Sequence, residues 1–137
     1  MASTQSKAIG AGQGRTLTVL GNTFRFKVSS DDTGDAFAVI EIESPPSGGI
    51  PPHTNNRESE THIIVRGRYQ FMLGGEMHEA PAGAVFFVPR GVPHAFQNVG
   101  SEPGAMLFIP SPRSRRNILS GLATPKRKFC PPRGNWA

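Results

Sequence analysis

Four side chains able to bind a metal or transfer a proton lie in two parts of the sequence. His53, Glu60 and His62 fall within ten residues, and His94 follows later in the chain. Imidazole and carboxylate groups together suit Fe, Mn, Ni or Zn, and two His with one carboxylate can hold a reactive metal. We therefore expect one divalent metal ion. If no metal binds, the same groups would form an acid–base cluster whose neighbouring charges separate their pKa values.

The chain around these residues has the two-residue period of β-strands. Phe24, Phe26 and Val28 alternate with Arg25 and Lys27, the pattern of a half-buried strand. With 16 Gly and 13 Pro, the chain is rich in turn residues, and nine or ten short strands between such turns favour a sandwich or barrel. The main segments expected as strands are 24–28, 36–43, 61–65, 69–73, 76–80, 84–88, 94–99 and 105–109.

Charge and composition divide the chain into three parts. We expect a disordered lead over 1–15, the barrel over 16–112, and a short amphipathic helix (114–123) plus a basic Pro-rich tail within 113–137. The last part has seven basic residues and no acidic one, which leaves eight basic and ten acidic residues before it. The tail lacks interleaved aromatic residues, so we expect a solvated or partner-facing segment and no nucleic-acid binding.

Two observations bear on location. No apolar run reaches the ~18 residues that a transmembrane helix requires, and the first residues lack the apolar stretch of a secretory signal. Cys130 is the single cysteine, so no intrachain disulfide can form. We expect a cytoplasmic protein with no membrane partner.

Two stretches resemble the paired motifs of the cupin superfamily. The second, 83–98, follows the family pattern Gly-x5-Pro-x-Gly-x2-His-x3-Asn at every fixed position. The first, 51–67, follows His-x-His-x4-Glu-x6-Gly, except that Asn55 occupies the position of the second His. The resemblance covers about 23–110 and implies an all-β, single-domain, jelly-roll antiparallel barrel.

The resemblance also implies a metal site facing the barrel interior. Its ligands would be His53, Asn55, Glu60 and His94. Asn55 could ligate weakly through its oxygen, orient a metal-bound water, or mark a site that no longer holds metal. His62 shares a strand face with Glu60, so it is either a substitute ligand or general base, or an interior histidine hydrogen-bonded to Glu60.

The closing segment, 102–112, resembles the last strand of small quercetinase-like cupins. That likeness implies an enzyme acting on a small, largely apolar organic molecule, such as an aromatic or polyketide-like compound. We favour metal-assisted cyclisation, isomerisation or dehydration over O₂-dependent ring cleavage, because Asn55 makes a poorer iron dioxygenase centre. The expected catalytic residues are Glu60, His62 and His94, and the expected substrate-binding residues are Asn55, Arg57, Phe71 and Phe96.

Two other functions compete with this one. A non-catalytic ligand-binding or sensor cupin would have a pocket without turnover and would depend on its basic tail. A metal-free sugar epimerase-type cupin needs a His/Asp dyad, and no Asp follows Asp35. In each case we expect a homodimer in which residues 17–28 pair or pack across the interface, since small barrels must cover their sheet edges.

Overall fold

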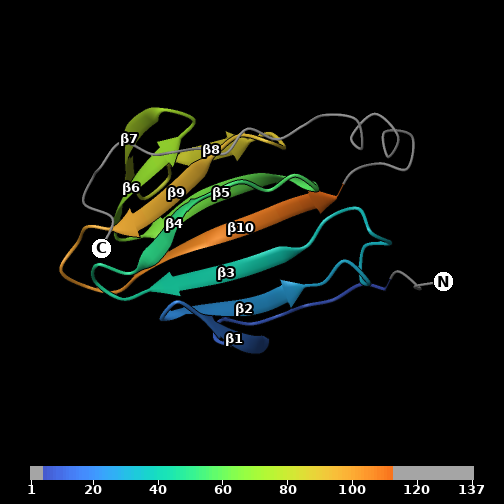
Figure 1. Ribbon diagram of the computed structural model, residues 1–137. Coiled ribbons are helices and arrows are strands. Elements are labelled where there is room, and N and C mark those ends of the chain that lie inside the picture. The colour runs from blue at the N-terminus through green and yellow to red at the C-terminus, as the bar shows by residue number, and fades with distance from the viewer. Residues whose placement is uncertain (1–4, 113–137) are drawn as a thin grey trace.

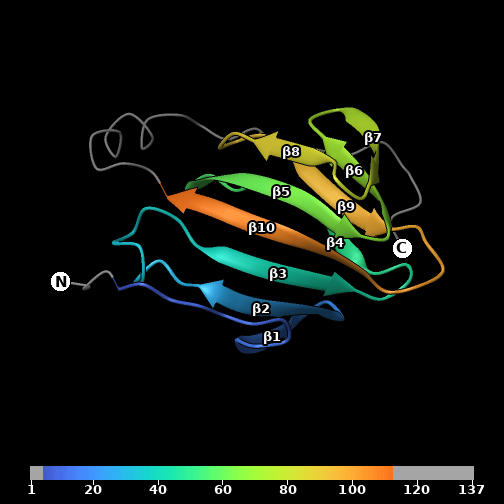
Figure 2. The same ribbon diagram turned by 180° about the vertical axis from the view of Figure 1, so that it is seen from behind.

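The computed structural model describes residues 5–112, which form ten strands in two facing sheets (Figures 1 and 2). The larger sheet has the order β1-β2-β3-β10-β5-β8 and the smaller β4-β9-β6-β7. Their strands are β1 (Arg15–Val19), β2 (Asn22–Val28), β3 (Val39–Ser44), β4 (Gly49–His53), β5 (Glu58–Arg66), β6 (Arg68–Leu73), β7 (Glu76–Pro81), β8 (Val85–Val88), β9 (His94–Asn98) and β10 (Gly104–Pro112).

Every strand pairing is antiparallel, and residues 5–112 contain no helix, so the expected all-β architecture is confirmed. It follows that this part of the chain has no helix able to cross a membrane. The helix expected over 114–123 and the basic tail lie outside the described residues.

Strand β4 was not among the expected strand segments, and it contains Pro51 and Pro52, which are unusual in a strand. Proline lacks the N–H that a ladder needs, but β4 is the edge of the smaller sheet and a bulge lies between Ile50 and His53. At the start of this strand the backbones of β4 and β9 approach closely. A Cβ on Gly49 would collide with the carbonyl oxygen of Phe96. Glycine is therefore required for β4 to pair with β9.

Strand β3 begins at Val39 rather than at residue 36. The Thr33 hydroxyl bonds the backbone of Phe37 in both directions, and Asp35 has a positive φ of 65°. This local turn holds residues 33–37 out of the sheet, so the strand can start only after it.

The core lies between the two sheets. Phe71 stacks on Phe86 with ring centroids 4.3 Å apart, and Ile42, Ile64 and Met106 fill the layer beside them. The alternation of the strands also brings Glu60 and His62 onto this inner face, where both are buried. The apolar core therefore surrounds two of the residues expected to do chemistry.

Candidate metal and acid–base site

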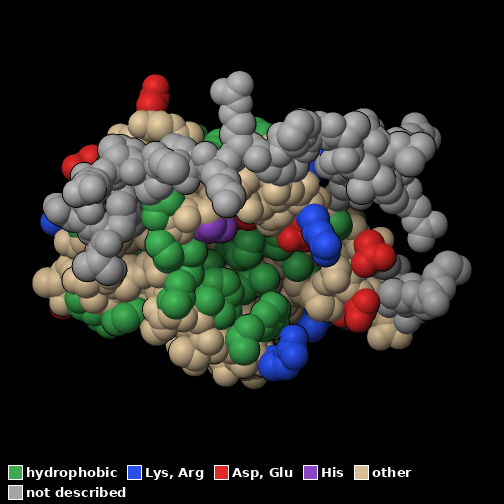
Figure 3. Space-filling model, in the orientation of Figure 1, with side chains coloured by type: hydrophobic (Ala, Val, Ile, Leu, Met, Phe, Trp, Pro, Cys, Tyr) green, Lys and Arg blue, Asp and Glu red, His purple; other side chains and the backbone are tan. Residues whose placement is uncertain are grey.

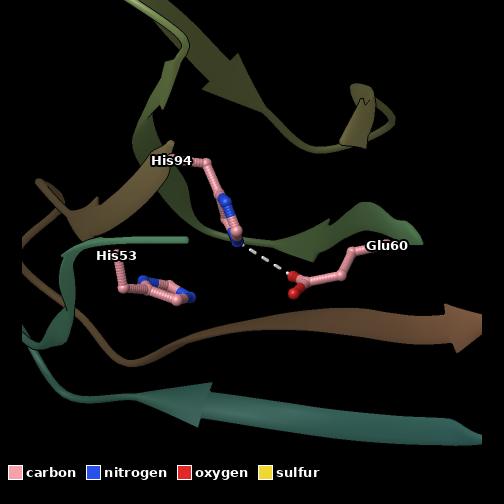
Figure 4. A group of neighbouring side chains, drawn as sticks. All are labelled: His53, Glu60 and His94. Carbon is pink, nitrogen blue, oxygen red and sulfur yellow. Dashed lines mark hydrogen bonds and ion pairs between the residues drawn. The ribbon is translucent and has the colours of Figure 1, made fainter. Parts of the chain in front are cut away.

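His53, Glu60 and His94 come together at one end of the inner face, each from a different strand (Figure 4). One ligand atom from each lies within 4.8 Å of the others. His53 at the end of β4 is paired in register with His94 at the start of β9, and their ring centroids are 4.2 Å apart. Pairing of β4 with β9 therefore brings the two histidines together, and β5 supplies the carboxylate.

The two histidines are held in the same tautomer by their own strands. Nδ1 of His53 lies 2.9 Å from the Pro51 carbonyl oxygen, and Nδ1 of His94 lies 3.0 Å from that of Val92. A carbonyl oxygen only accepts, so each Nδ1 carries a proton and donates it. The Nε2 lone pairs are left to face the site, as in histidines that bind a metal through Nε2.

Glu60 is the centre of a hydrogen-bond network and is only 3% exposed. The Nε2–H of His62 donates to its Oε1 at 2.9 Å, and Nε2 of His94 lies 3.0 Å from the same oxygen. Burial alone would raise the pKa of Glu60, but the hydrogen bond from His62 and the contact with His94 together outweigh it and lower this pKa. The carboxylate is therefore ionised at neutral pH.

The contact between His94 and Glu60 favours a bound cation. Because Nδ1 of His94 already carries a proton, a hydrogen bond from Nε2 to the carboxylate requires a second proton on the ring. A metal ion held by His94 and Glu60 would satisfy both groups without that proton. The donor set of two imidazole nitrogens and one carboxylate thus fits a divalent metal of the Fe, Mn, Ni or Zn type.

His53 is less enclosed than the other ligand candidates. The residue as a whole is exposed, while its ring packs against His94 on one side. Loss of water around the ring lowers the pKa of His53, and the nearby His94 lowers it further. His53 was expected to face the barrel interior with Glu60 and His94, and it lies where the site opens to solvent.

His62 contacts Glu60 but lies outside the set of mutually close ligand atoms. It is 2% exposed, stacks on Phe108 at 5.0 Å and meets the edge of Phe71 at 5.0 Å. Burial lowers the pKa of His62, and its Nδ1 has no hydrogen-bond partner among residues 5–112. His62 is therefore a neutral ring whose one N–H is directed at Glu60, the geometry of an interior histidine.

Asn55 is oriented by the loop between β4 and β5. Its Oδ1 accepts backbone N–H groups from Arg57 at 2.9 Å and Glu58 at 3.1 Å, which fixes the amide orientation. Its Nδ2 donates to Oε2 of Glu60 at 3.0 Å. The expectation that Asn55 ligates through oxygen does not fit this orientation, because the oxygen is engaged elsewhere and the nitrogen is a donor.

The residues expected to bind substrate divide into two groups. Phe71 and Phe96 are buried, at 0% and 2% exposure, and their rings lie 5.0 and 6.0 Å from that of His62. Arg57 is exposed and adjoins Asn55. Sequence reasoning missed Phe108, which stacks on His62; only the pairing of β10 with β5 puts the two side by side.

An apolar hollow adjoins the site. Figure 3 shows a histidine at the upper side of a hollowed surface of hydrophobic side chains. A cavity of about 460 Å³ lies at the β1–β2 turn and the first half of β4. Its lining residues are Leu20, Ser47, Gly48, Gly49, Ile50, Pro51, Phe96 and Gln97. Pro51 links it to the site, because the same residue accepts the hydrogen bond from His53.

Comparison with known proteins gives a family match. A family model described as Cupin domain matches residues 40–110. Germin-like protein 5-1 of Oryza sativa subsp. japonica is 30% identical over 112 residues, which is 72% of this chain and 46% of the relative. Polyketide synthase CurC of Streptomyces cyaneus is 30% identical over 79 residues, 58% of this chain and 51% of the relative. The chain spans about half the length of these curated relatives.

The fold recurs among solved structures. The polyketide cyclase RemF of Streptomyces resistomycificus superposes with a TM-score of 0.69 and 24% sequence identity. The match covers 78% of this chain and 80% of that one. At this identity, the likeness concerns the arrangement of the strands.

Proposed function

The chain belongs to the cupin family, and from that premise we propose a metal-assisted, non-redox enzyme acting on a small aromatic or polyketide-like molecule. The reaction class is cyclisation, isomerisation or dehydration. The observation that carries the proposal is the set of two Nε2 lone pairs and one ionised carboxylate beside an apolar hollow. The likeness to CurC and RemF, which are named for polyketide chemistry, supports the substrate class.

In this proposal His53, Glu60 and His94 hold the metal. When bound, the ion would act as a Lewis acid on a substrate oxygen, which makes a neighbouring C–H more acidic. His53 is the exposed ligand, so the substrate would approach from its side of the site. The apolar side chains around the hollow would bind the substrate rings and exclude water.

The protein's own proton acceptor is the Glu60 carboxylate. Its Oε2 is oriented by the N–H of Asn55, and its Oε1 by the N–H of His62. Nε2 of His62 already donates to Glu60, and its remaining lone pair, on Nδ1, lies on the other side of the ring from that carboxylate. We therefore assign proton transfer to Glu60 and treat His62 and Asn55 as the groups that hold it in place.

An O₂-dependent dioxygenase is the second candidate. Two histidines and one carboxylate with open positions can also hold Fe(II) for oxygen chemistry. The two activities differ in one measurable quantity, because ring cleavage consumes O₂ and cyclisation does not. A non-catalytic binding cupin would retain the apolar hollow and show no turnover with either class of substrate.

The association and location of the chain stay predictions. We propose a homodimer that pairs through the edge of β1, which ends the larger sheet beside the exposed Leu17 and Leu20, so that the inner face of β2 stays uncovered. Cytoplasmic location and the absence of nucleic-acid partners are likewise proposed from the composition.

The test is metal analysis of protein purified without chelator or nickel resin. Wild type is expected to hold close to one metal ion per chain, and Glu60→Gln, which keeps the shape of the side chain but loses its charge, is expected to lose it. His78→Gln is the matched control, because His78 is a partly exposed histidine on β7 outside the site. Circular dichroism verifies that each variant folds.

Two results would contradict the proposal. One is wild-type protein that takes up no Fe, Mn, Ni or Zn even when each is supplied in excess. The other is a Glu60→Gln variant that keeps its metal. Where metal is present, O₂ uptake during turnover separates the dioxygenase from the non-redox enzyme.

A further inference from the structure

One row of paired residues crosses the inner face of the larger sheet, from the site to an arginine at the opposite edge. The strand registers place Arg15 opposite Phe26, Phe26 opposite Ile40, Ile40 opposite Phe108, and Phe108 opposite His62. Directly paired residues in an antiparallel sheet point to the same face. The five side chains therefore form one continuous line on the face that carries Glu60.

Exposure along the line is greatest at the arginine end. His62 and Ile40 are buried, Phe108 and Phe26 are half-buried, and Arg15 is exposed. The neighbouring row is apolar along its whole length. It consists of Leu17, Phe24, Ile42, Met106 and Ile64. On the face seen in Figure 3, hydrophobic side chains form a broad area below a histidine, and basic side chains lie at its lower rim.

Arg15 lies over the open end of the row. Its guanidinium carbon is 4.9 Å from the centre of the Phe26 ring, a cation–π contact. It forms no salt bridge with any acidic residue in 5–112, whereas Arg25 on the next strand bonds both Glu41 and Glu43. No acidic side chain of the described part of the chain therefore neutralises the Arg15 guanidinium, and a planar guanidinium binds a carboxylate with two parallel hydrogen bonds.

We propose that this row binds an elongated aromatic substrate carrying a carboxylate, with that carboxylate on Arg15 and the reacting end beside Glu60. Phe26, which lies beneath the Arg15 guanidinium, and His62 are three strands apart, so roughly 14 Å separates them at about 4.8 Å per strand. Arg15 is then a specificity-determining residue that selects acids over neutral analogues. The inference rests on the proposed function only for what happens at the Glu60 end.

The test uses two fluorescent probes that differ in charge, anthracene-2-carboxylate and anthracene-2-carboxamide, titrated onto the full chain. Arg15→Gln is expected to weaken binding of the acid about fivefold, the effect of an exposed ion pair, and to leave the amide almost unchanged. Arg15→Lys keeps the charge and should recover part of the loss. Arg66→Gln is the matched control, because Arg66 is exposed at the end of β5 and lies outside the row.

A second variant tests the aromatic platform. Phe26→Leu keeps an apolar side chain but removes the ring beneath the guanidinium, and it is expected to weaken both probes. The inference is overturned if Arg15→Gln affects acid and amide equally or not at all, or if Phe26→Leu changes neither. It is also overturned if light scattering shows a dimer and probe binding falls as the dimer forms, since a second copy would then cover this face.

These titrations are separable from the test of the proposed function. They are run with and without a chelator, and the difference between acid and amide is expected in both conditions. A chain that binds the acid through Arg15 but holds no metal would keep this inference and contradict the metal enzyme. A chain that holds metal but binds acid and amide equally would keep the metal enzyme and contradict this inference.

Discussion

The two cupin motifs each contain an asparagine near a histidine, and the two asparagines do different work. Asn98, at the end of β9, donates to the carbonyls of Ser44 at 3.0 Å and Glu102 at 2.8 Å, and accepts the Gly100 N–H at 2.9 Å. Asn55, in the first motif, is fixed by its own loop and directs its N–H at Glu60.

Asn98 therefore stabilises the fold, whereas Asn55 acts on the site. All the partners of Asn98 are backbone groups, and it joins the ends of β3 and β9 to the loop before β10. Asn55 has backbone partners on one side and a buried carboxylate on the other. The second motif, which matches the family pattern fully, includes a structural clamp, whereas the first motif departs from the pattern at the residue that touches the chemistry.

The largest effect should come from breaking the clamp. Asn98→Ala leaves the carbonyls of Ser44 and Glu102 without their partner in the buried interior, and we expect it to cost about 2–3 kcal/mol of unfolding free energy. Urea denaturation of metal-free protein measures this. The folded variant should still bind metal like wild type. Loss of metal affinity without loss of stability would contradict the division between the two asparagines.

A smaller effect, on metal rather than on stability, is expected at the other asparagine. Asn55→Ala removes the N–H that orients Glu60, and loss of a partner of this kind costs about tenfold or more in metal affinity. Competition with a chelating dye measures the dissociation constant. Asn55→His, which restores the family residue, offers an imidazole at the same position and should raise affinity above wild type. Equal affinity in all three proteins would show that Asn55 has no role in the site.

The smallest effect concerns pH. Burial lowers the pKa of His62 in the folded chain, so between that pKa and the ordinary value near 6.5 the unfolded chain binds more protons. Stability therefore rises with pH across this window and falls on acidification. In metal-free protein, thermal unfolding between pH 7 and pH 5 should depend less on pH in His62→Gln than in wild type. An unchanged or steeper dependence would argue against a buried neutral His62.

Much of the fold could be read from local features of the chain. Alternation such as that of Phe24 and Phe26 indicates strands, and Gly–Pro turn signals divide them, so most strands were expected within a few residues. The family motifs also led to His53, Glu60 and His94 as one group, and the structure brings their ligand atoms together.

Other features required the three-dimensional pairing. Strand β4 breaks the local rule against proline because an edge strand does not need every N–H. The orientation of Asn55 depends on which of its atoms meets the backbone of Arg57 and Glu58, and an asparagine in a sequence carries no such information.

The sequence by itself determined which residues could do chemistry and that they would lie on strands, because residue type and two-residue alternation are local properties. The tertiary structure alone decided which side chains meet. Arg15 and His62 stand in one row only because four strand pairings share a register, and two of them, β3 with β10 and β10 with β5, join segments far apart in the chain. Register is set by packing across the whole sheet, and no short stretch of sequence contains it.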